Sequence, residues 1–341
     1  MGWRLSDRAL AEQFRAAGAS CRIVPVVMGA AGRLRRTMAL TDAVEALAAV
    51  HAARGVRAGA TIFSSVTAAL LQRPQGPHAV RFDTTASLNR PGAGGAWQRR
   101  HQPKVLAGAD LLLPWSQAAA TAALAAVASA AVGRSMVPRQ VVLPPPLERA
   151  AGPAPDAPEA IAYAANPDKR GLDLLCRAWA VAAPPGARLV VGGIERGKAL
   201  RWLERQGVPE PTGVEWAGAV ERGRWLALVA GARVFVNASR FEDWGQAQME
   251  ALAAGTPLVT VPTPGPNMAL APARELAPAL VAPAADPDAL AAALAAGLAM
   301  AASARATYAA GATRLLAPYG ENALRRVVAE EVLPALLGSS S

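Results

Sequence analysis

The chain has 341 residues and a net charge of +10, a length that predicts about two domains, each large enough to bury its own core. Its two cysteines, Cys21 and Cys176, lie far apart and its three histidines form no cluster, which argues against a disulfide framework and a zinc-type site. The longest apolar stretches, 118–132 and 289–302, are Ala-rich and too short to span a bilayer, and no signal-peptide pattern is present. We therefore expect a cytoplasmic protein.

The positive charge is concentrated in the first half of the chain. Residues 1–150 contain 18 Lys and Arg and 7 Asp and Glu, a net charge of +11, and the remainder contains 17 and 18, a net charge of −1. Two interpretations stay open: an Arg-rich soluble surface, or a half that faces an anionic acceptor or makes peripheral contact with the inner face of a membrane. Basic and aromatic residues are not interleaved, so we do not expect nucleic acid as a partner. The basic runs are Arg33, Arg35 and Arg36, and Arg99, Arg100 and Lys104.

Short apolar runs alternate with helical stretches through the first half and predict a helix-covered parallel sheet. Two Pro-rich segments, 144–146 and 152–158, then mark a stiff linker, where we expect the domain boundary. The expected strands of this half are 21–27, 60–63, 79–82, 110–114 and 140–143.

The same alternation returns after the linker. Its expected strands are 160–164, 188–191, 214–217, 232–236, 258–261 and 279–281, followed by helices at 287–312 and 322–337. The pattern predicts an α/β protein with two Rossmann-like parallel sheets that face each other across a cleft. The expected domains are 1–150 and 151–320, with a C-terminal helix and short tail at 321–341.

A pair of glutamates marks residues 241–255, FEDWGQAQMEALAAG. Glu242 lies in the loop after the expected strand 232–236, and Glu250 lies on the helix that follows. Gly245 lets the backbone come close to a ligand, so that the first amides of the helix can face its oxygens. Two carboxylates beside a helix N-terminus suit a ligand with both hydroxyls and phosphates. The alternative is a solvated helix face.

The string SRFEDWGQAQMEALAAGTPLV at 239–259 resembles the donor-site signature of GT-B fold, family-4-type retaining glycosyltransferases, also called glycosyl transferases group 1. The resemblance covers most of residues 2–300 and is strongest over 160–282. It implies that Glu242 contacts hydroxyls of the donor sugar and that Glu250 binds the ribose hydroxyls. The loop of Trp244, Gly245 and Gln246 would help to hold the sugar and phosphates. In this family the last helix often crosses back to the first domain.

Two bases precede the helix expected at 172–182. Lys169 and Arg170 stand where the resemblance implies that an Arg and a Lys contact the donor diphosphate, so one of them is expected to meet the charge of the leaving phosphate. The family's upstream Arg is replaced by Ala164 or Ala165. The alternative is two solvated bases at a helix start, where the helix dipole disfavours cations.

The segment GGIERGK at 192–198 follows an expected strand and nearly matches a phosphate-binding P-loop. Residue 199 is Ala, however, so the hydroxyl that would bind Mg²⁺ is absent. The resemblance instead implies that Gly192 and Gly193 border the nucleotide in the donor pocket.

Three positions in the first half are candidates for the acceptor side. Asp83 follows a strand where the family often has His-Asp, with Phe82 in place of the His; an aspartate that caps the next turn is the alternative. Ser116 follows the strand 110–114 and is expected to border the cleft. Gly2 is what remains of the family's first glycine-containing loop, because no strand precedes residues 2–18. Either the sheet lacks its first strand, or the true N-terminus lies upstream of Met1.

The resemblance implies a glycosyltransferase that moves a sugar from a nucleotide-diphosphate donor to an acceptor with retention of anomeric configuration. Its catalytic candidates are Glu242, Lys169, Arg170 and Asp83. No D-x-D signature stands out, so we expect no metal and no cofactor beyond the nucleotide sugar as co-substrate. The alternatives are another GT-B enzyme, an epimerase or phosphorylase, and a catalytically silent basic protein that binds membrane surfaces. The sequence does not predict the sugar, the base, the acceptor or the oligomeric state.

Overall fold

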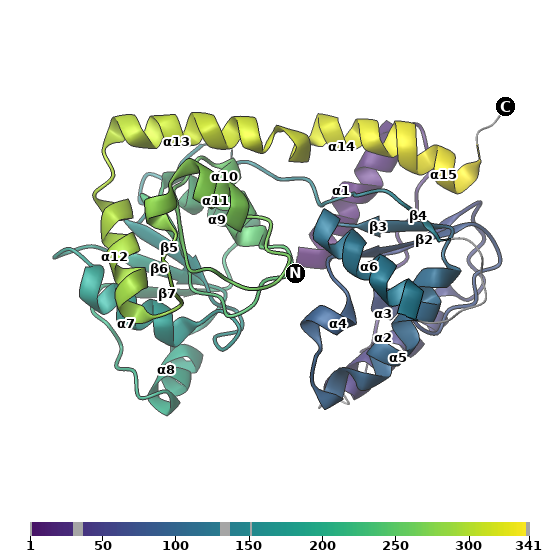
Figure 1. Ribbon diagram of the computed structural model, residues 1–341, viewed down its shortest axis with the longest axis horizontal. Helices are drawn as coiled ribbons and strands as arrows, with labels where there is room; N and C mark the ends of the chain where they lie inside the picture. The colour runs from purple at the N-terminus through teal and green to yellow at the C-terminus, as the bar shows by residue number, and fades with distance from the viewer. Residues whose placement is uncertain (1, 30–36, 130–136, 151, 339–341) are drawn as a thin grey trace. The chain divides into compact units, whose positions relative to one another are not determined.

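The computed structural model describes residues 2–29, 37–129, 137–150 and 152–338. They divide into two compact units (Figure 1): unit 1 comprises Met1–Pro146 and Tyr319–Ser341, and unit 2 comprises Leu147–Pro318. Each unit contains a parallel β-sheet covered by helices. The predicted α/β class with two parallel-sheet domains is therefore confirmed.

The described sheet of unit 1 has four strands that neighbour one another in chain order, β1-β2-β3-β4, and every neighbouring pair is parallel. The register pairs Ala79 with Leu111, and Leu111 in turn with Arg139. The strands are β1 Thr61–Phe63, β2 His78–Phe82, β3 Leu111–Pro114 and β4 Arg139–Gln140. The helices are α1 Gly2–Ala16, α2 Met38–Ala53, α3 Val66–Ala69, α4 Ala86–Asn89, η2 Ala93–Gly95, α5 Ala96–Gly108, α6 Gln117–Ser129, α14 Glu321–Val327, the π-helix η5 Val328–Val332 and α15 Leu333–Leu337.

Alternate residues of the central strands β2 and β3 pack against different sets of helices, as the two-residue period of a strand requires. Val80 and Leu112 join buried residues of α2, α3, α5 and α6 on one face. Leu111 and Leu113 join α1 and the C-terminal helices α14, η5 and α15 on the other. Because both faces are covered, β3 appears in the sequence as an unbroken apolar run, LLLP.

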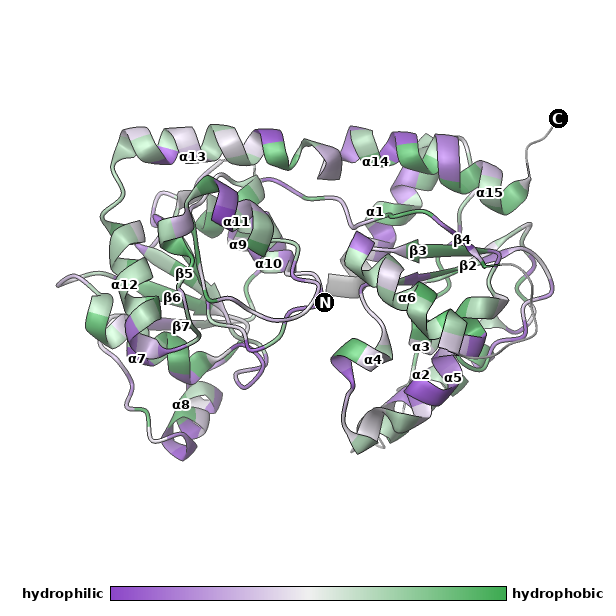
Figure 2. Cartoon of the chain, viewed as in Figure 1, coloured by the Kyte–Doolittle hydropathy of each residue, from purple (hydrophilic) through white to green (hydrophobic). Residues whose placement is uncertain are grey.

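The sheet of unit 2 has the order β7-β6-β5-β8-β9, with every pair parallel. The chain moves outward from β5 to β7 and then returns to β8, so the order reverses between β5 and β8; such a switch point is where α/β sheets bind ligands. Helices α7, α8 and α12 cover one face, whereas Trp225 of α9 packs edge-to-face on Phe235 of β8 on the other. Figure 2 shows hydrophobic residues along β5 and β6.

The strands of unit 2 are β5 Ala160–Tyr163, β6 Leu189–Gly192, β7 Val214–Gly218, β8 Val234–Asn237 and β9 Leu258–Thr260. Its helices are α7 Leu172–Ala182, α8 Arg196–Arg205, α9 Arg222–Gly231, α10 Gln246–Ala253, α11 Leu270–Leu276, η3 Pro278–Leu280, α12 Pro287–Leu298 and α13 Ala302–Leu315, and the short η4 Ala317–Tyr319 precedes α14.

The strand expected at 21–27 is wrong. This segment has no regular secondary structure, and its Ile23, Val26 and Val27 side chains are exposed. Pro25 in its middle has no N–H to donate to a strand ladder. The apolar residues of this segment predicted a buried strand, but Pro25 and the exposed side chains are not compatible with one.

Other elements also differ from expectation: the strand expected at 140–143 is Arg139–Gln140, and the helix expected at 322–337 is α14, η5 and α15. The segment expected as a strand at 279–281 is mostly the turn η3, which starts at Pro278, and only Val281 bridges to Thr260. The helix expected at 287–312 is two helices, α12 and α13, bent by 103° at their junction. Gly2 lies within α1 and not in a loop before it.

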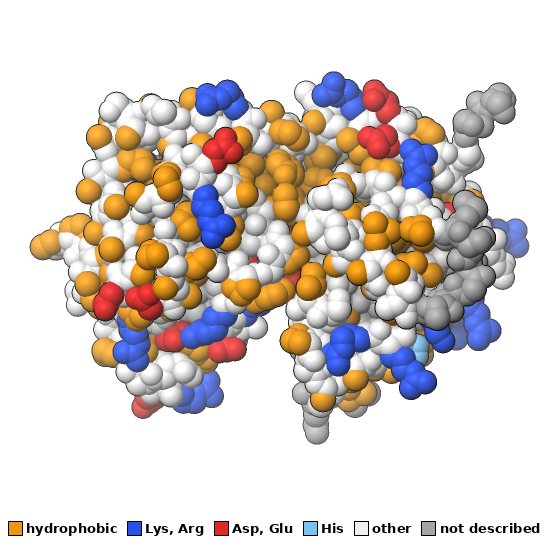
Figure 3. Space-filling model, viewed as in Figure 1, with side chains coloured by type: hydrophobic (Ala, Val, Ile, Leu, Met, Phe, Trp, Pro, Cys, Tyr) orange, Lys and Arg blue, Asp and Glu red, His pale blue; other side chains and the backbone are white. Residues whose placement is uncertain are grey.

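Three properties of the described ranges concern metal binding, membrane-spanning helices and the distribution of basic residues. No group of three or more His, Cys, Asp or Glu side chains in them is arranged to hold a metal ion. No single helix in them is long and apolar enough to cross a membrane, although the bent pair α12 and α13 meets that test when counted together. On the face shown in Figure 3, Lys and Arg side chains of unit 1 lie at separate places. The run of Arg33, Arg35 and Arg36 lies outside the described residues.

Candidate active site

Two loops meet at the switch point of the unit 2 sheet. One leaves β5 and carries Lys169 and Arg170, and the other leaves β8 and carries Glu242. Arg240 joins them: its backbone N–H donates to the Lys169 carbonyl at 2.9 Å, and its guanidinium donates to the Asp168 carbonyl at 2.7 Å. Adjacent parallel strands end at the same edge of a sheet, which brings these two distant parts of the sequence together.

Glu242 is buried and held by side chains from the loop after β5 and from α10. Arg170 donates to Glu242 Oε2, and Gln248 donates to the same oxygen at 2.9 Å. The Glu242 N–H donates to the Pro264 carbonyl at 3.0 Å, which fixes the loop backbone. A buried carboxylate needs such partners, because an unpaired charge in the interior is costly.

Lys169 pairs with the residue next to Glu242. Its Nζ lies 2.7 Å from Asp243 Oδ2 and 5.7 Å from the centre of the Phe241 ring. The side chains of Lys169 and Arg170 remain 34% and 21% exposed, so both cations are accessible to a ligand. The two predicted phosphate ligands therefore lie against the predicted sugar-binding loop.

Glu250 is buried on α10 and accepts hydrogen bonds from three side chains. Arg222 Nη1 lies 2.9 Å and Gln246 Nε2 2.7 Å from Oε1, and Trp225 Nε1 lies 3.3 Å from Oε2. Burial raises the pKa of the Glu250 carboxyl, and the charge of Arg222 with these hydrogen bonds opposes part of the rise. Arg222 also donates to Glu148 at 2.9 Å, so it lies between two carboxylates.

Glycines begin the helices that follow both loops. Gly171 caps α7 with φ 59°, and a Cβ there would lie 2.1 Å from the Ala238 carbonyl oxygen. Gly245 caps α10 with φ 85°. The preceding Trp244 is buried, and its carbonyl accepts from the Met268 N–H at 3.2 Å. Both glycine positions have a positive φ, and Gly171 also lies close to a neighbouring backbone, so both favour glycine.

The glycine pair after β6 lies near the partners of Glu250. A Cβ on Gly192 would come within 2.5 Å of the Trp225 ring, which donates to Glu250. Gly193 has φ 87° and donates to the Gly218 carbonyl at 2.6 Å. The predicted nucleotide-bordering loop is thus packed on the same aromatic side chain as the predicted ribose ligand.

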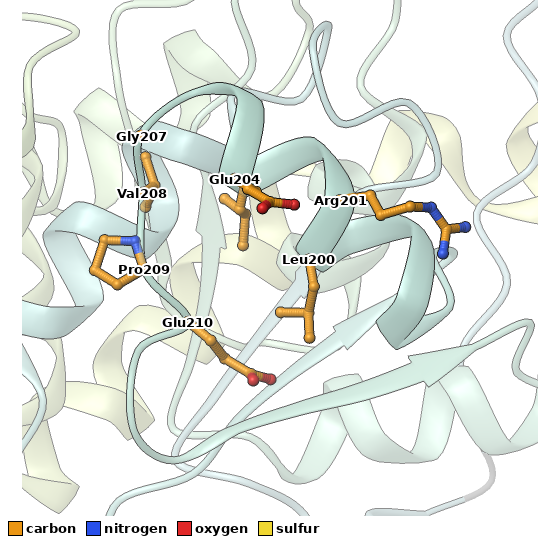
Figure 4. A pocket seen from close by; sticks show the side chains of 8 residues that line it. Leu200, Arg201, Glu204, Gly207, Val208, Pro209 and Glu210 are labelled. Carbon is orange, nitrogen blue, oxygen red and sulfur yellow. The ribbon is translucent and has the colours of Figure 1, made fainter.

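A hollow of about 470 Å³ lies elsewhere on unit 2, between α8 and the loop that follows it (Figure 4). Its lining includes Leu200, Arg201, Glu204 and Glu210 and none of the predicted site residues. We do not place the active site there, because its side chains are not those that the motif brings together.

The candidates in unit 1 have a different setting. Asp83 directly follows β2, and Ser116 follows β3, where its hydroxyl accepts from the Ala119 N–H and so caps α6. Arg81, which the sequence reasoning did not single out, is fully buried beneath Trp115, with its guanidinium carbon 4.8 Å from the ring centre.

Arg81 is held by the first helix. It donates to the Ser6 hydroxyl, and its Nη1 lies 3.4 Å from Asp7 Oδ1. Burial lowers the pKa of Arg81 to about 10, although Asp7 and Asp83 oppose the shift, and burial also raises the pKa of Asp7. Gly2 lies four residues earlier on the same helix as Ser6.

Sequence reasoning missed Arg222 and Gln248, which hold the two motif glutamates. The contact of Gln246 with Glu250 has the i, i+4 spacing of neighbouring helix positions, which could have indicated it. No spacing rule connects Arg222 with Glu250 or Gln248 with Glu242, because those contacts depend on how helices and loops fold against each other.

Residues 158–300 match the family model of the glycosyl transferases group 1. Among solved structures, the chain is similar to sucrose-phosphate synthase from Thermosynechococcus elongatus, with TM-score 0.62, 18% identity, and 85% of this chain and 77% of that one covered. It is similar to Anabaena Alr3699/HepE in complex with UDP-glucose, with TM-score 0.61, 15% identity, and 86% and 76% covered. It is also similar to the trehalose-6-phosphate synthase OtsA, with TM-score 0.60, 15% identity, and 82% and 73% covered. No curated protein sequence matches it.

The chain is a GT-B glycosyltransferase. At 15–18% identity the solved structures show its fold, and the family match over 158–300 assigns the activity class to unit 2. Both predictions made from the glutamate motif, the GT-B fold and a glycosyltransferase, are confirmed.

Proposed function

We propose that this glycosyltransferase is a family-4-type retaining enzyme that transfers a sugar from a nucleotide-diphosphate donor held by unit 2. The observation that carries the proposal is the matched arrangement of the two motif glutamates. Each is buried, and each accepts from one arginine and one glutamine: Arg170 and Gln248 for Glu242, and Arg222 and Gln246 for Glu250.

In this proposal each part of the donor meets a group that complements it. Glu250 accepts the two ribose hydroxyls, beside the loop of Gly192 and Gly193. Lys169 and Arg170 bind the diphosphate, because both are cationic and partly exposed. Glu242 and the loop of Trp244, Gly245 and Gln246 hold the sugar. HepE was solved in complex with UDP-glucose, which supports a nucleotide sugar as the donor here.

The proposed reaction exchanges one bond at the anomeric carbon for another on the same face. The bond to the diphosphate oxygen breaks, the acceptor oxygen bonds to the anomeric carbon, and the acceptor proton passes to the departing phosphate oxygen. Lys169 and Arg170 stabilise the charge that grows on the leaving group, with the first amides of α10. We propose no metal and no cofactor beyond the nucleotide sugar.

We place the acceptor side on unit 1, with Asp83 and Ser116 at the carboxyl ends of β2 and β3 and Gly2 on α1. Asp83 is the proposed catalytic carboxylate near the acceptor hydroxyl. The net charge of +11 in residues 1–150 favours an anionic or membrane-surface acceptor. The proposed location is the cytoplasm, with peripheral contact at the inner face of the membrane.

Calorimetry of the full chain with UDP, ADP and GDP tests the donor site first. At least one diphosphate should bind, and Glu250→Ala should weaken it about tenfold or more, because charge-assisted hydrogen bonds are lost. The control is Glu204→Ala, an exposed carboxylate on α8, which should bind as the wild type does. Failure of all three to bind would contradict a nucleotide donor.

Proton NMR of donor turnover then tests the stereochemistry. The matching nucleotide glucose should release or transfer glucose whose first-formed anomer has the configuration of the donor. The inverted anomer would contradict retention. Release of an epimerised sugar nucleotide, or of sugar phosphate only when phosphate is added, would identify the epimerase or phosphorylase alternatives.

A further inference from the structure

Two buried amide oxygens beside Glu242 have no hydrogen-bond donor in the part of the chain that the structure describes. Gln248 is 2% exposed, and its Nε2 donates to Glu242 Oε2 at 2.9 Å, which fixes the orientation of the amide. Its Oε1 therefore points away from that bond, and no donor in the described residues reaches it. Asn267, in the loop after β9, is 8% exposed, and its Oδ1 likewise has no partner there.

These two oxygens converge on one place at the start of α10. The point that a Cβ of Gly245 would occupy lies 3.2 Å from Asn267 Oδ1, 3.2 Å from Gln248 Oε1 and 3.4 Å from Glu242 Cγ. Oδ1 of Asp243, the next residue in the chain after Glu242, is also buried, and none of the described residues donates to it. The corner formed by Glu242, Gln248 and Asn267 thus presents acceptors with unused capacity among the described residues.

Buried acceptors without donors destabilise a protein, so each such group calls for an explanation. A ligand rich in hydroxyls supplies what the corner lacks, because each hydroxyl donates one hydrogen bond. A ligand that presents a carboxylate there would instead bring further acceptors and negative charge towards Glu242 and Asp243. The chemistry therefore selects a neutral polyhydroxyl group.

We propose that Gln248 and Asn267 determine donor-sugar specificity by accepting hydrogen bonds from hydroxyls of a neutral hexose, and that they disfavour a hexuronic acid. The inference rests on the proposed function, since it takes the site beside Glu242 to be the sugar end of the donor. In this proposal the nucleotide, bound at Glu250, does not contact Gln248 or Asn267.

The test compares binding of a nucleoside diphosphate with binding of its sugar conjugates by calorimetry. The probes are UDP, UDP-glucose and UDP-glucuronate, with ADP and ADP-glucose and with GDP and GDP-glucose in parallel because the base is not assigned. Asn267→Leu and Gln248→Met remove the acceptor oxygens and keep similar volume. The matched controls are Asn322→Leu and Gln206→Met, whose side chains are exposed and outside the site.

In Asn267→Leu the affinity for the nucleotide glucose should fall about three- to tenfold, the loss of one neutral hydrogen bond, and in Gln248→Met it should fall by at least as much, because the bond from Gln248 to Glu242 is lost too. The affinity for the diphosphate should stay the same in both variants. The controls should change neither. The wild type should bind UDP-glucose more tightly than UDP-glucuronate if the base is uracil, a comparison that needs no variant to fold.

Three results would overturn the inference. An unchanged affinity for the nucleotide glucose in both folded variants would show that the oxygens do not contact the sugar. Equal losses for both probes would show that the amides only support the loop. Equal affinity for UDP-glucose and UDP-glucuronate would remove the claimed selectivity. Absence of any diphosphate binding by the wild type would instead contradict the proposed function itself, and the inference with it.

Discussion

The sheets of the two units differ in strand order, and that difference decides how each sheet is covered. In unit 1 the order follows the chain, so the crossover helices α3, α5 and α6 lie on one face. The other face is covered by α1 and the C-terminal helices α14, η5 and α15. In unit 2 the order reverses between β5 and β8, so the unit's own crossover helices lie on both faces.

The two units also differ in how exposed their paired basic residues are. At the switch point of unit 2, Lys169 and Arg170 are paired with carboxylates yet partly exposed. At the end of β2 in unit 1, Arg81 is fully buried and paired with Asp7. We therefore expect charge in unit 2 to serve ligand binding and this charge in unit 1 to serve stability. The following experiments test that contrast.

The largest effect is expected where the two loops of the switch point touch. Gly171→Ala would place a Cβ 2.1 Å from the Ala238 carbonyl oxygen at a φ of 59°. Left-handed strain and the backbone clash together should lower the free energy of unfolding by about 3–5 kcal/mol. Gly207→Ala is the matched control, because Gly207 has φ 62° and nothing within 4 Å of its Cβ position.

The control should lose only about 1–2 kcal/mol, the strain alone. Urea unfolding followed by tryptophan fluorescence measures both values. Equal losses in the two variants would mean that the contact between the loops does not matter for stability.

Arg81→Leu should come next in size. Removing the guanidinium leaves the Asp7 carboxyl without its cationic partner, so the free energy of unfolding should fall by about 3 kcal/mol. Arg196→Leu, which breaks an exposed pair with Glu210, should cost no more than about 1 kcal/mol. Nucleotide affinity should not change in either variant. Weaker nucleotide binding by folded Arg81→Leu would break the proposed separation of roles.

Glu250→Ala tests whether charge in unit 2 serves ligand binding. It should reduce the free energy of nucleoside diphosphate binding by about 1.5–3 kcal/mol, since charge-assisted bonds to the ribose are lost. Its effect on unfolding should be smaller than that of Arg81→Leu, because Arg222 keeps Glu148 as a partner. Calorimetry and urea unfolding of the same samples decide between these effects. Unchanged affinity would place the ribose elsewhere.

Substitutions of Lys169 and Arg170 test whether these bases stabilise the leaving group in unit 2. Arg170→Met should lower kcat about tenfold or more and change diphosphate affinity less, because leaving-group charge grows in the transition state. Lys169→Met, which breaks the pair with the more exposed Asp243, should have the smaller effect. Steady-state kinetics with the best donor measures both, and two silent substitutions would refute this placement of the phosphate.

The strands of both sheets and the glutamate pair could be predicted because their signals are local. Buried central strands such as 111–114 are continuous apolar runs, and Glu242 lies in the loop after such a run. The strand expected at 21–27 was wrong because an apolar run alone does not specify a strand, and Pro25 has no N–H to donate to a strand ladder. Local patterns also do not specify strand order, so the sequence could not reveal that Arg222 on α9 would meet Glu250 on α10.

The smallest effect concerns the pH dependence of Glu250. Burial raises the pKa of this carboxyl in the folded state above 4.5, whereas the unfolded chain keeps the ordinary value. Between these two values the folded state binds more protons than the unfolded state, so this group's contribution to stability falls as pH rises through that range. Arg222 faces the carboxyl and Glu148 faces Arg222, so both influence the size of the pKa shift.

The difference in free energy of unfolding between the wild type and Glu250→Gln should therefore decrease with rising pH, by at most about 1.4 kcal/mol per pH unit. Diphosphate affinity should show the opposite trend, since the ionised carboxylate is the better acceptor for ribose hydroxyls. Urea unfolding and calorimetry from pH 4.5 upward, with Glu250→Gln as the reference that cancels titration of the phosphates, measure both slopes. A pH-independent difference would mean that the Glu250 carboxyl titrates alike in the folded and unfolded chains.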